Sequence, residues 1–373
     1  MRSKISFTIK SILFFAFLNG TTLPQTVPIP QIKFSPKKYV CYQSNKNIKI
    51  DGKLDDADWQ KAEWTDDFVD IEGSVKPTPR YTTKAKMLWD KKYLYVAAEL
   101  HEPDIWATLK NRDAVIFYDN DFEIFIDPDG DTHSYCEFEI NALNTVWDLL
   151  LIQPYRDIDN AAVTGWDIKG LKTGVAINGT LNRSGDKDKS WTVEIAFPWE
   201  AFKEISFTSV PPRNEDQWRI NFSRVEWKTE TKNGKYQKQI NPATNKFYPE
   251  NNWVWSPQKV VNMHYPEMWG YLQFAEAKVG KKKIPFIEKN DEAAKWFLRQ
   301  IYYHEKLFFK NHKMFSSDFA KLGIGEQPIP GYSSTIDLQS TTNMFEASLL
   351  SEDGKFKMNI RNDGRVWKSE ITK

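Results

Sequence analysis

The feature that most constrains the fold is a series of short alternating segments between residues 38 and 276. In most of them apolar and polar residues alternate, which is the pattern of a strand with one buried face. Turn-forming sequences such as DPDGDT, NRSGDKDKS and KNGK separate the segments. Many strands at short spacing, with few helix-length patterns, predict an all-β, antiparallel β-sandwich of jelly-roll type. The segments are KAKMLWD, KYLYVAAEL, DFEIFID, YCEFEIN, TVWDLLL, GVAING, WTVEIAF, WRINFSRVEW and WGYLQF.

The pattern changes after residue 276. The lysine-rich stretch VGKKKIP indicates an exposed linker, which we place at residues 277–289. Residues 291 to 312 then carry apolar side chains at three- and four-residue steps, which predicts an amphipathic helix. The final segments MFEASLL, KFKMNIR and RVWKSE are joined by Asp-Gly turns and predict a three-stranded meander. We therefore expect a small C-terminal unit, a helix plus a β-meander, at residues 290–373.

The N-terminus has the layout of a secretory signal peptide. Arg2, Lys4 and Lys10 precede an apolar run from residue 12 to 18, and the small polar stretch NGTT follows. This run is too short to span a bilayer, so we predict a signal peptide at residues 1–22 and an exported protein, periplasmic, cell-surface or secreted. An uncleaved N-terminal anchor is the alternative. No later stretch predicts a spanning helix, so no other membrane contact is expected.

Composition narrows the classes of partner. The 51 basic and 50 acidic residues leave a formal charge of +1, which gives no global field for attracting nucleic acid or an anionic membrane. Hydrophobic residues make up 40% of the chain, enough for one large or two smaller cores. Recognition must therefore be local, and the sequence does not define an oligomeric state.

Two cysteines, Cys41 and Cys136, leave two alternatives. In an exported protein they can form a disulfide, or they can be separate buried thiols. Their spacing is not that of a zinc site.

The strand segments DFEIFID, YCEFEIN and WRINFSR each have an apolar and a polar face. Alternation places Glu123 of the first, Glu137 and Glu139 of the second and Asn221 of the third on the polar faces. If the three strands are neighbours, these groups form one surface that suits sugar hydroxyls. The alternative is that this surface is only the solvated side of an antiparallel sheet.

Five motifs occur in order: IDGKLDDADW, MLWDKKYLYVAAEL, NDFEIFIDPDGD, WTVEIAFPW, and WSP followed by WG. Together they resemble the family 9 carbohydrate-binding modules and their stand-alone relatives in exported bacterial proteins. The resemblance covers about residues 40–276. It implies a β-sandwich that binds sugars without cleaving them, in some members with structural calcium.

The resemblance also points to candidate contact positions. In the family, one stacking tryptophan lies just before the acidic strand and another lies in the late loop between WS and the closing aromatic-Gly. An ungapped pairing places the first on Phe117, with Tyr118 beside it, and the second on Met263, with His264 beside it. The tryptophan pair of the family is therefore not kept in this chain.

Two polar positions differ as well, since the family's arginine becomes Glu139 and its glutamine becomes Ser223. Sugars need rings to stack on and polar side chains that fix their orientation. We expect those roles to fall to aromatic and polar residues around these positions. The candidate carbohydrate-binding residues are Trp106, Phe117, Tyr118, Asn120, Glu139, Asn141, Asn221, Arg224 and His264.

The sequence DPDGD follows the acidic strand and carries three aspartates. Asp127, Asp129 and Asp131 can direct oxygens at one point, which is a start on the six to eight oxygens that calcium prefers. The alternative is an ordinary exposed Asp-Gly turn. We name these three residues as the candidate ligands of a structural Ca²⁺.

No sequence motif for catalysis is evident: there is no nucleophile elbow, HExxH, Walker loop or Rossmann fingerprint. We therefore name no catalytic residue and expect non-catalytic binding of a polysaccharide or oligosaccharide, by an exported protein involved in polysaccharide capture or breakdown. Two alternatives stay open. One is a protein-interaction module without sugar affinity, and the other is an accessory domain with glycoside hydrolase activity.

Overall fold

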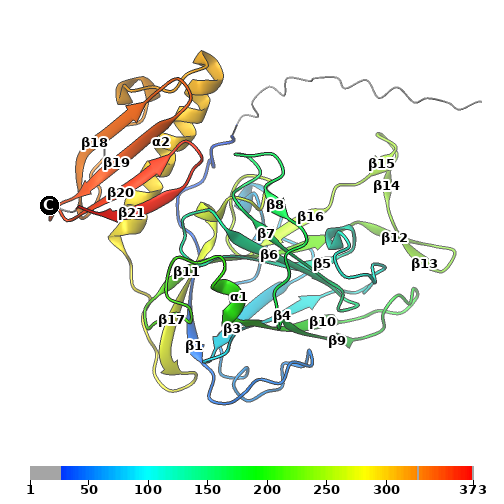
Figure 1. Ribbon diagram of the computed structural model, residues 1–373. Coiled ribbons are helices and arrows are strands. Elements are labelled where there is room, and N and C mark those ends of the chain that lie inside the picture. Colours follow the sequence, from blue (N-terminus) through cyan, green and yellow to red (C-terminus); the bar gives the residue numbers. More distant parts are fainter. Residues whose placement is uncertain (1–26, 326, 372–373) are drawn as a thin grey trace, which may run out of the picture.

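The computed structural model describes residues 27–325 and 327–371 (Figure 1). The predicted signal peptide lies outside the described residues. Thirteen strands between residues 38 and 278 form one continuous hydrogen-bonded sheet. In spatial order its main strands are β8 (Ala162–Val163), β7 (Val146–Leu151), β6 (Tyr135–Asn141), β5 (Asp121–Asp127), β11 (Gln217–Glu226), β17 (Gly270–Lys278), β1 (Lys38–Gln43), β3 (Thr83–Trp89), β4 (Tyr93–His101), β10 (Ser190–Pro198) and β9 (Lys172–Asn178).

Shorter elements decorate this sheet. Strand β16 (Asn251–Val254) pairs with β11 and with β2 (Val69–Asp70). Two separate hairpins project from the body, β12 (Thr229–Lys232) with β13 (Lys235–Lys238), and β14 (Ile240–Asn241) with β15 (Lys246–Phe247) (Figure 1). The short helices are α1 (Trp199–Phe202), η1 (Gly73–Val75), η2 (Ile116–Tyr118), η3 (Pro266–Met268) and η4 (Phe319–Leu322).

The sheet folds over on itself into two layers, which confirms the predicted β-sandwich. Phe138 of β6 and Phe197 of β10 meet edge to face across the layers, with ring centroids 5.5 Å apart. The alternating apolar residues of β5, β6 and β11 turn inward and join those of β3, β4 and β10 in one buried core. Cys41 and Cys136 are part of that core and both are free thiols, so the second of the two cysteine alternatives holds in this structure.

Strand β1 departs from the antiparallel pattern. It lies parallel to β17, with Lys38 opposite Tyr271, and parallel to β3, with Tyr42 opposite Leu88. The other pairings within the sheet are antiparallel, as their short connections require. Strand β1 therefore lies between β3 and β17, and neither of these strands is joined to it by a hairpin turn.

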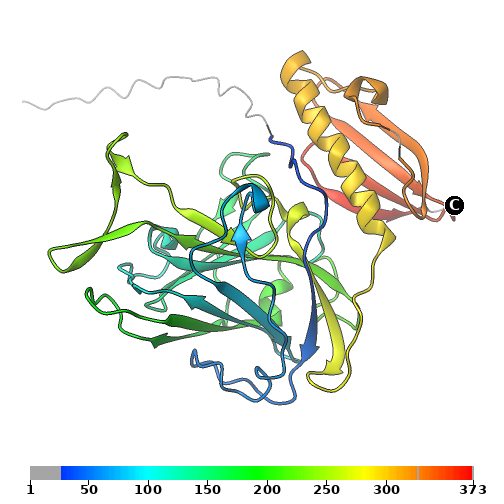
Figure 2. The same cartoon turned by 180° about the vertical axis from the view of Figure 1, so that it is seen from behind.

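The C-terminal unit consists of the helix α2 (Asn290–His312) and a four-stranded antiparallel sheet. Asp291 and Glu292 in its first turn and Lys310 and His312 in its last complement the helix dipole. The helix covers one face of the sheet, and its apolar side shares a core with the strands (Figure 2). The sheet order is β18 (Tyr332–Ser340), β19 (Phe345–Ser351), β20 (Phe356–Arg361) and β21 (Val366–Glu370).

The predicted three-stranded meander corresponds to β19, β20 and β21, and β18 was not predicted. Its sequence YSSTIDLQS has few apolar residues, and most of its side chains are exposed or half-buried because β18 is an edge strand. Across the described residues, no helix is long and apolar enough to cross a membrane.

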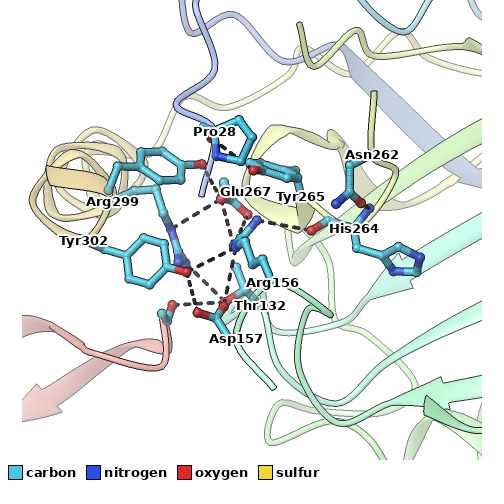
Figure 3. Close-up of polar contacts among 12 residues, drawn as sticks. Pro28, Thr132, Arg156, Asp157, Asn262, His264, Tyr265, Glu267, Arg299 and Tyr302 are labelled. Atoms are coloured by element: carbon cyan, nitrogen blue, oxygen red, sulfur yellow. Dashed lines mark hydrogen bonds and ion pairs between the residues drawn. The ribbon is translucent and has the colours of Figure 1, made fainter. Parts of the chain in front are cut away.

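A buried network of charges and hydroxyls joins the C-terminal unit to the sandwich (Figure 3). Arg156, from the loop after β7, donates from Nη2 to Glu267 Oε2 at 3.1 Å and from Nε to the Tyr302 hydroxyl at 3.3 Å. The Tyr302 hydroxyl in turn donates to Asp157 Oδ1 at 2.5 Å. Arg299 of α2 donates to the Thr132 hydroxyl at 3.2 Å. Because these groups are buried and paired across the contact, the two units are held in a defined arrangement.

Candidate functional site

A pocket of about 340 Å³ opens on the face of β5 and β6 that points away from the core. Its wall combines aromatic rings with carboxylates, and three segments far apart in the sequence contribute to it. The lining residues are Ile71, Phe117, Glu123, Phe125, Glu137, Glu139, Trp147, Tyr155, Val225, Glu250, Asn252, Val261, Asn262, Met263 and His264.

The carboxylates meet because of strand register. Glu123 of β5 is directly opposite Glu139 of β6, and Phe125 is opposite Glu137. Glu139 is in turn opposite Trp147 of β7. Residues opposite each other on neighbouring strands point to the same face, so three glutamates and a tryptophan share one surface. The Phe117 backbone N–H, from η2, donates to Glu139 Oε2 at 2.9 Å and fixes that carboxylate.

Two loops complete the wall. Met263 and His264 come from the loop before η3, and Tyr155 comes from the loop after β7. The Tyr155 and His264 rings meet edge to face, with centroids 4.5 Å apart. His264 Nδ1 also hydrogen-bonds the Tyr135 hydroxyl at 2.9 Å. The late loop is therefore anchored to β6, and it presents its side chains opposite Phe117 and the carboxylates.

Burial shifts the protonation equilibria of the pocket. Burial raises the pKa of Glu123 to about 7. Burial first, and then the charge of Glu123, raise the pKa of Glu137 well above its ordinary value, and Glu139 is affected in the same way. For His264, burial and then the nearby Arg156 lower the pKa to about 3. A neutral imidazole thus faces a group of carboxyls that resist ionisation.

Three of the nine candidate residues line this pocket: Phe117, Glu139 and His264. Met263, the second position paired with a family tryptophan, also lines it. The structure thus brings the two positions that match the family tryptophans, which are far apart in sequence, into the wall of one cavity.

Three further candidates lie near the pocket but not in its wall. Trp106 is buried against Val225 and Trp227. Tyr118 is 55% exposed and turns outward beside the hairpin lysine Lys238, whose ammonium is 5.4 Å from its ring. Asn120 accepts a hydrogen bond from the Trp227 backbone N–H at 2.8 Å.

The remaining three candidates are engaged in internal bonds. Asn141 accepts from the backbone N–H groups of residues 143 and 145 and so shapes the turn after β6. Asn221 bonds both backbone groups of Ser256. Arg224 follows Ser223 by one residue, so it points to the opposite face of β11, where it pairs with Glu102 and Glu226. We see no route by which these three side chains reach the pocket.

The other lining residues were not among the candidates, and they include Glu123, Glu137, Trp147 and Tyr155. Alternation had already placed the two glutamates on the polar faces, and the pairing of β6 with β7 puts Trp147 opposite Glu139. Tyr155 lies in a loop without periodicity, so no sequence signal indicated it.

The three aspartates of DPDGD form a separate cluster, with one oxygen from each within 4.8 Å of the others. Both oxygens of Asp127 accept backbone N–H groups, from Gly130 and Thr132 at 2.9 Å. Asp131 accepts from Arg365 Nε at 2.9 Å, whereas Asp129 Oδ1 is buried without a partner. Burial and then the neighbouring aspartate charges raise the pKa of Asp127 and Asp129. An all-oxygen set with one free buried carboxylate oxygen fits a calcium ion.

Comparison with known proteins gives one family. The sequence model described as carbohydrate family 9 binding domain-like matches residues 50–277. Exoglucanase XynX of Acetivibrio thermocellus is 37% identical over 162 residues, which is 43% of this chain and 12% of that protein. The chain therefore spans only a small part of that relative's length.

Solved structures with a similar chain path include a Bacteroides uniformis protein, 16% identical, covering 64% of this chain and all of that one, with a TM-score of 0.47. A family 9 carbohydrate-binding module from Caldicellulosiruptor kristjanssonii, solved with cellotriose, is 17% identical. It covers 67% of this chain and all of that one, with a TM-score of 0.39.

Proposed function

Because the chain belongs to the carbohydrate family 9 binding domain-like family, we propose that it binds a polysaccharide or oligosaccharide at the pocket on β5 and β6 and leaves it intact. The observation that carries this proposal is the composition of the wall. Rings from Phe117, Trp147 and Tyr155 stand around fixed carboxylates within the residues that match the family. Rings supply contact area for the C–H faces of a sugar, and carboxylate oxygens accept hydrogen bonds from its hydroxyls.

The proposal includes export and a role beside polysaccharide breakdown. The composition of residues 1–22 supports export. The likeness to part of an exoglucanase supports the second point, since a binding unit can keep such an enzyme close to its substrate.

Affinity electrophoresis with a panel of soluble plant and microbial polysaccharides tests the proposal. We expect at least one glycan to retard the mature chain and Trp147→Ala to lose most of that retardation. Phe247→Ala is the matched control, because Phe247 is an exposed ring on a hairpin outside the pocket. Absence of retardation by every glycan would favour the alternative of a protein-interaction module.

A second candidate function is glycoside hydrolysis. It is favoured by one observation, the raised pKa values of Glu123, Glu137 and Glu139 in a cavity, because catalytic acids are often tuned in this way. Release of reducing ends from a retained glycan, abolished by Glu123→Gln, would establish it. Retention without release supports binding alone.

A further inference from the structure

The pocket wall is acidic and has no cation of its own. Among the described residues no lysine or arginine lines it, and His264 stays neutral because its pKa is lowered to about 3. Burial and the nearness of the other carboxylates oppose ionisation of these glutamates, so a ligand that brings a positive charge stabilises their ionised form. The acidic lining residues are Glu123, Glu137, Glu139 and Glu250.

Glu137 is a carboxylate of the pocket that receives no hydrogen bond from the described chain. It is only 7% exposed, and within the described chain no group donates a hydrogen bond to its side chain. His264 Nε2 is the nearest cation-forming atom, at 3.9 Å, which is beyond hydrogen-bond range. Its carboxylate oxygens are accessible only from the cavity side, so the protein itself supplies no donor to them. Since Glu137 borders an open cavity, the missing donor can arrive with a ligand.

The other acidic clusters of the described chain differ in this respect. Asp148 is paired with Arg112, and Asp131 accepts a hydrogen bond from Arg365. Each of those clusters therefore contains one carboxylate that is paired with an arginine. The cluster that includes Glu123 and Glu139 has no such arginine.

Lys238 lies close enough to Glu250 of the pocket for their charges to interact. Burial lowers the pKa of Lys238, and the charges of Asp119 and then Glu250 oppose this effect. The Lys238 ammonium, however, lies 3.3 Å from the centroid of the Trp227 ring and does not line the pocket. It therefore supplies no hydrogen-bond donor to Glu137.

We propose that the pocket selects a saccharide unit that carries a free ammonium group, that is, an unacetylated amino sugar. This inference rests on the proposed function, since it names the class of sugar that the same pocket takes. An ammonium group has three donors and a positive charge, which match Glu137 and its two glutamate neighbours. The volume of about 340 Å³ and the rings of Phe117 and Trp147 suit a sugar ring rather than a bare ion. A sugar that carries a carboxylate has no such match, because its negative charge opposes ionisation of the same glutamates.

Isothermal titration calorimetry with three oligosaccharides of equal length tests the inference. A deacetylated chito-oligosaccharide, its N-acetylated form and a cello-oligosaccharide share one backbone and differ only at the second carbon. With EDTA present throughout, we expect the deacetylated ligand to bind about tenfold or more tightly than the other two. Glu137→Gln should remove most of that preference, and Glu276→Gln, an exposed position on β17, should keep it.

The outcomes separate the two proposals. Equal or tighter binding of the neutral ligands overturns the amino-sugar inference and leaves carbohydrate binding in place. The titrations are repeated without EDTA. Neutral ligands that then bind as tightly as the deacetylated one also overturn the inference, because a metal ion would be the cation. If none of these ligands and no glycan of the wider panel binds, both proposals fail. The preference of the unaltered chain decides the matter even if Glu137→Gln does not fold.

Discussion

Arg156 Nη1 donates a hydrogen bond of 3.1 Å to the backbone carbonyl of His264. The same guanidinium pairs with Glu267 and bonds the Tyr302 hydroxyl, so it belongs to the network that joins the C-terminal unit to the sandwich (Figure 3). Tyr155, the residue before it, lines the pocket. One buried arginine therefore connects the contact between the two units with two side chains of the pocket wall.

Replacing this arginine should weaken both features. In Arg156→Met, Glu267 and Asp157 lose a buried cation, and we expect the free energy of unfolding to fall by about 3 kcal/mol. Affinity for the retained glycan should fall as well, because the loops that carry Tyr155 and His264 lose an anchor. Thermal unfolding and affinity electrophoresis measure the two effects. Arg213→Met, at an exposed position, is the control and should change stability by less than about 0.5 kcal/mol. Equal stability of the two variants would contradict this account.

Glu305 makes the stability of the chain depend on pH. Burial raises its pKa to about 7, and its Oε1 is buried without a partner while Oε2 accepts from Ser316. The folded state thus binds this proton more tightly than the unfolded state, where the pKa is near about 4.3. The stabilisation is full below the unfolded value and is lost as the pH rises through about 7.

Glu305→Gln should remove that loss. We expect the variant to be more stable than the unaltered chain by about 1 to 3 kcal/mol at alkaline pH, with little difference at acidic pH. Melting temperatures across this pH range test the expectation, with the exposed Glu352→Gln as control. A constant difference at every pH would show that Glu305 does not titrate as described.

Calcium should stabilise the fold through the DPDGD cluster. If an ion binds only the folded state, an excess of one hundred times its dissociation constant adds about 2.7 kcal/mol. We expect a chelator to lower the melting temperature and Asp129→Asn to cancel that response, because Asp129 carries the unpaired oxygen. Asp67→Asn, at an exposed position, should respond to the chelator like the unaltered chain. A chelator without effect on any variant would exclude a calcium site of this kind.

The imidazole of His264 should stay neutral across the ordinary working range. Burial and Arg156 lower its pKa to about 3, so its ring signals in an NMR titration should not move between about pH 5 and pH 8. His264→Asn identifies the signals by their loss. An inflection near the ordinary histidine value of about 6.5 would mean that His264 becomes a cation in the pocket, which contradicts a wall without a positive charge.

Strand parity explains how much of this site the sequence could predict. Alternation along DFEIFID and YCEFEIN correctly placed Glu123, Glu137 and Glu139 on one face, because a strand leaves its side chains only two directions. The same rule places Arg224 on the core side, one residue after Ser223, although we named it as a sugar contact. Parity could not show that Asn141 and Asn221 use their amides on nearby backbone, since that depends on the local turns.

The loop residue Tyr155 and the edge strand β18 were harder to predict from the sequence. Tyr155 enters the wall because Arg156 is bound by groups from α2 and from the late loop, a contact between segments more than a hundred residues apart. Strand β18 was missed because an edge strand needs few apolar residues, and only one of its faces meets the helix-covered core. The family resemblance, by contrast, matched Phe117 and Met263 to the two stacking tryptophans, and both residues line the pocket.

The parallel strand β1 has a consequence for how the chain matures. Lys38 of β1 pairs with Tyr271 of β17, so β1 has no partner on that side until residue 271 has been synthesised. Contacts this distant in sequence form slowly. During synthesis the chain therefore has an unpaired strand edge. Such an edge is prone to aggregate, and chaperones protect it.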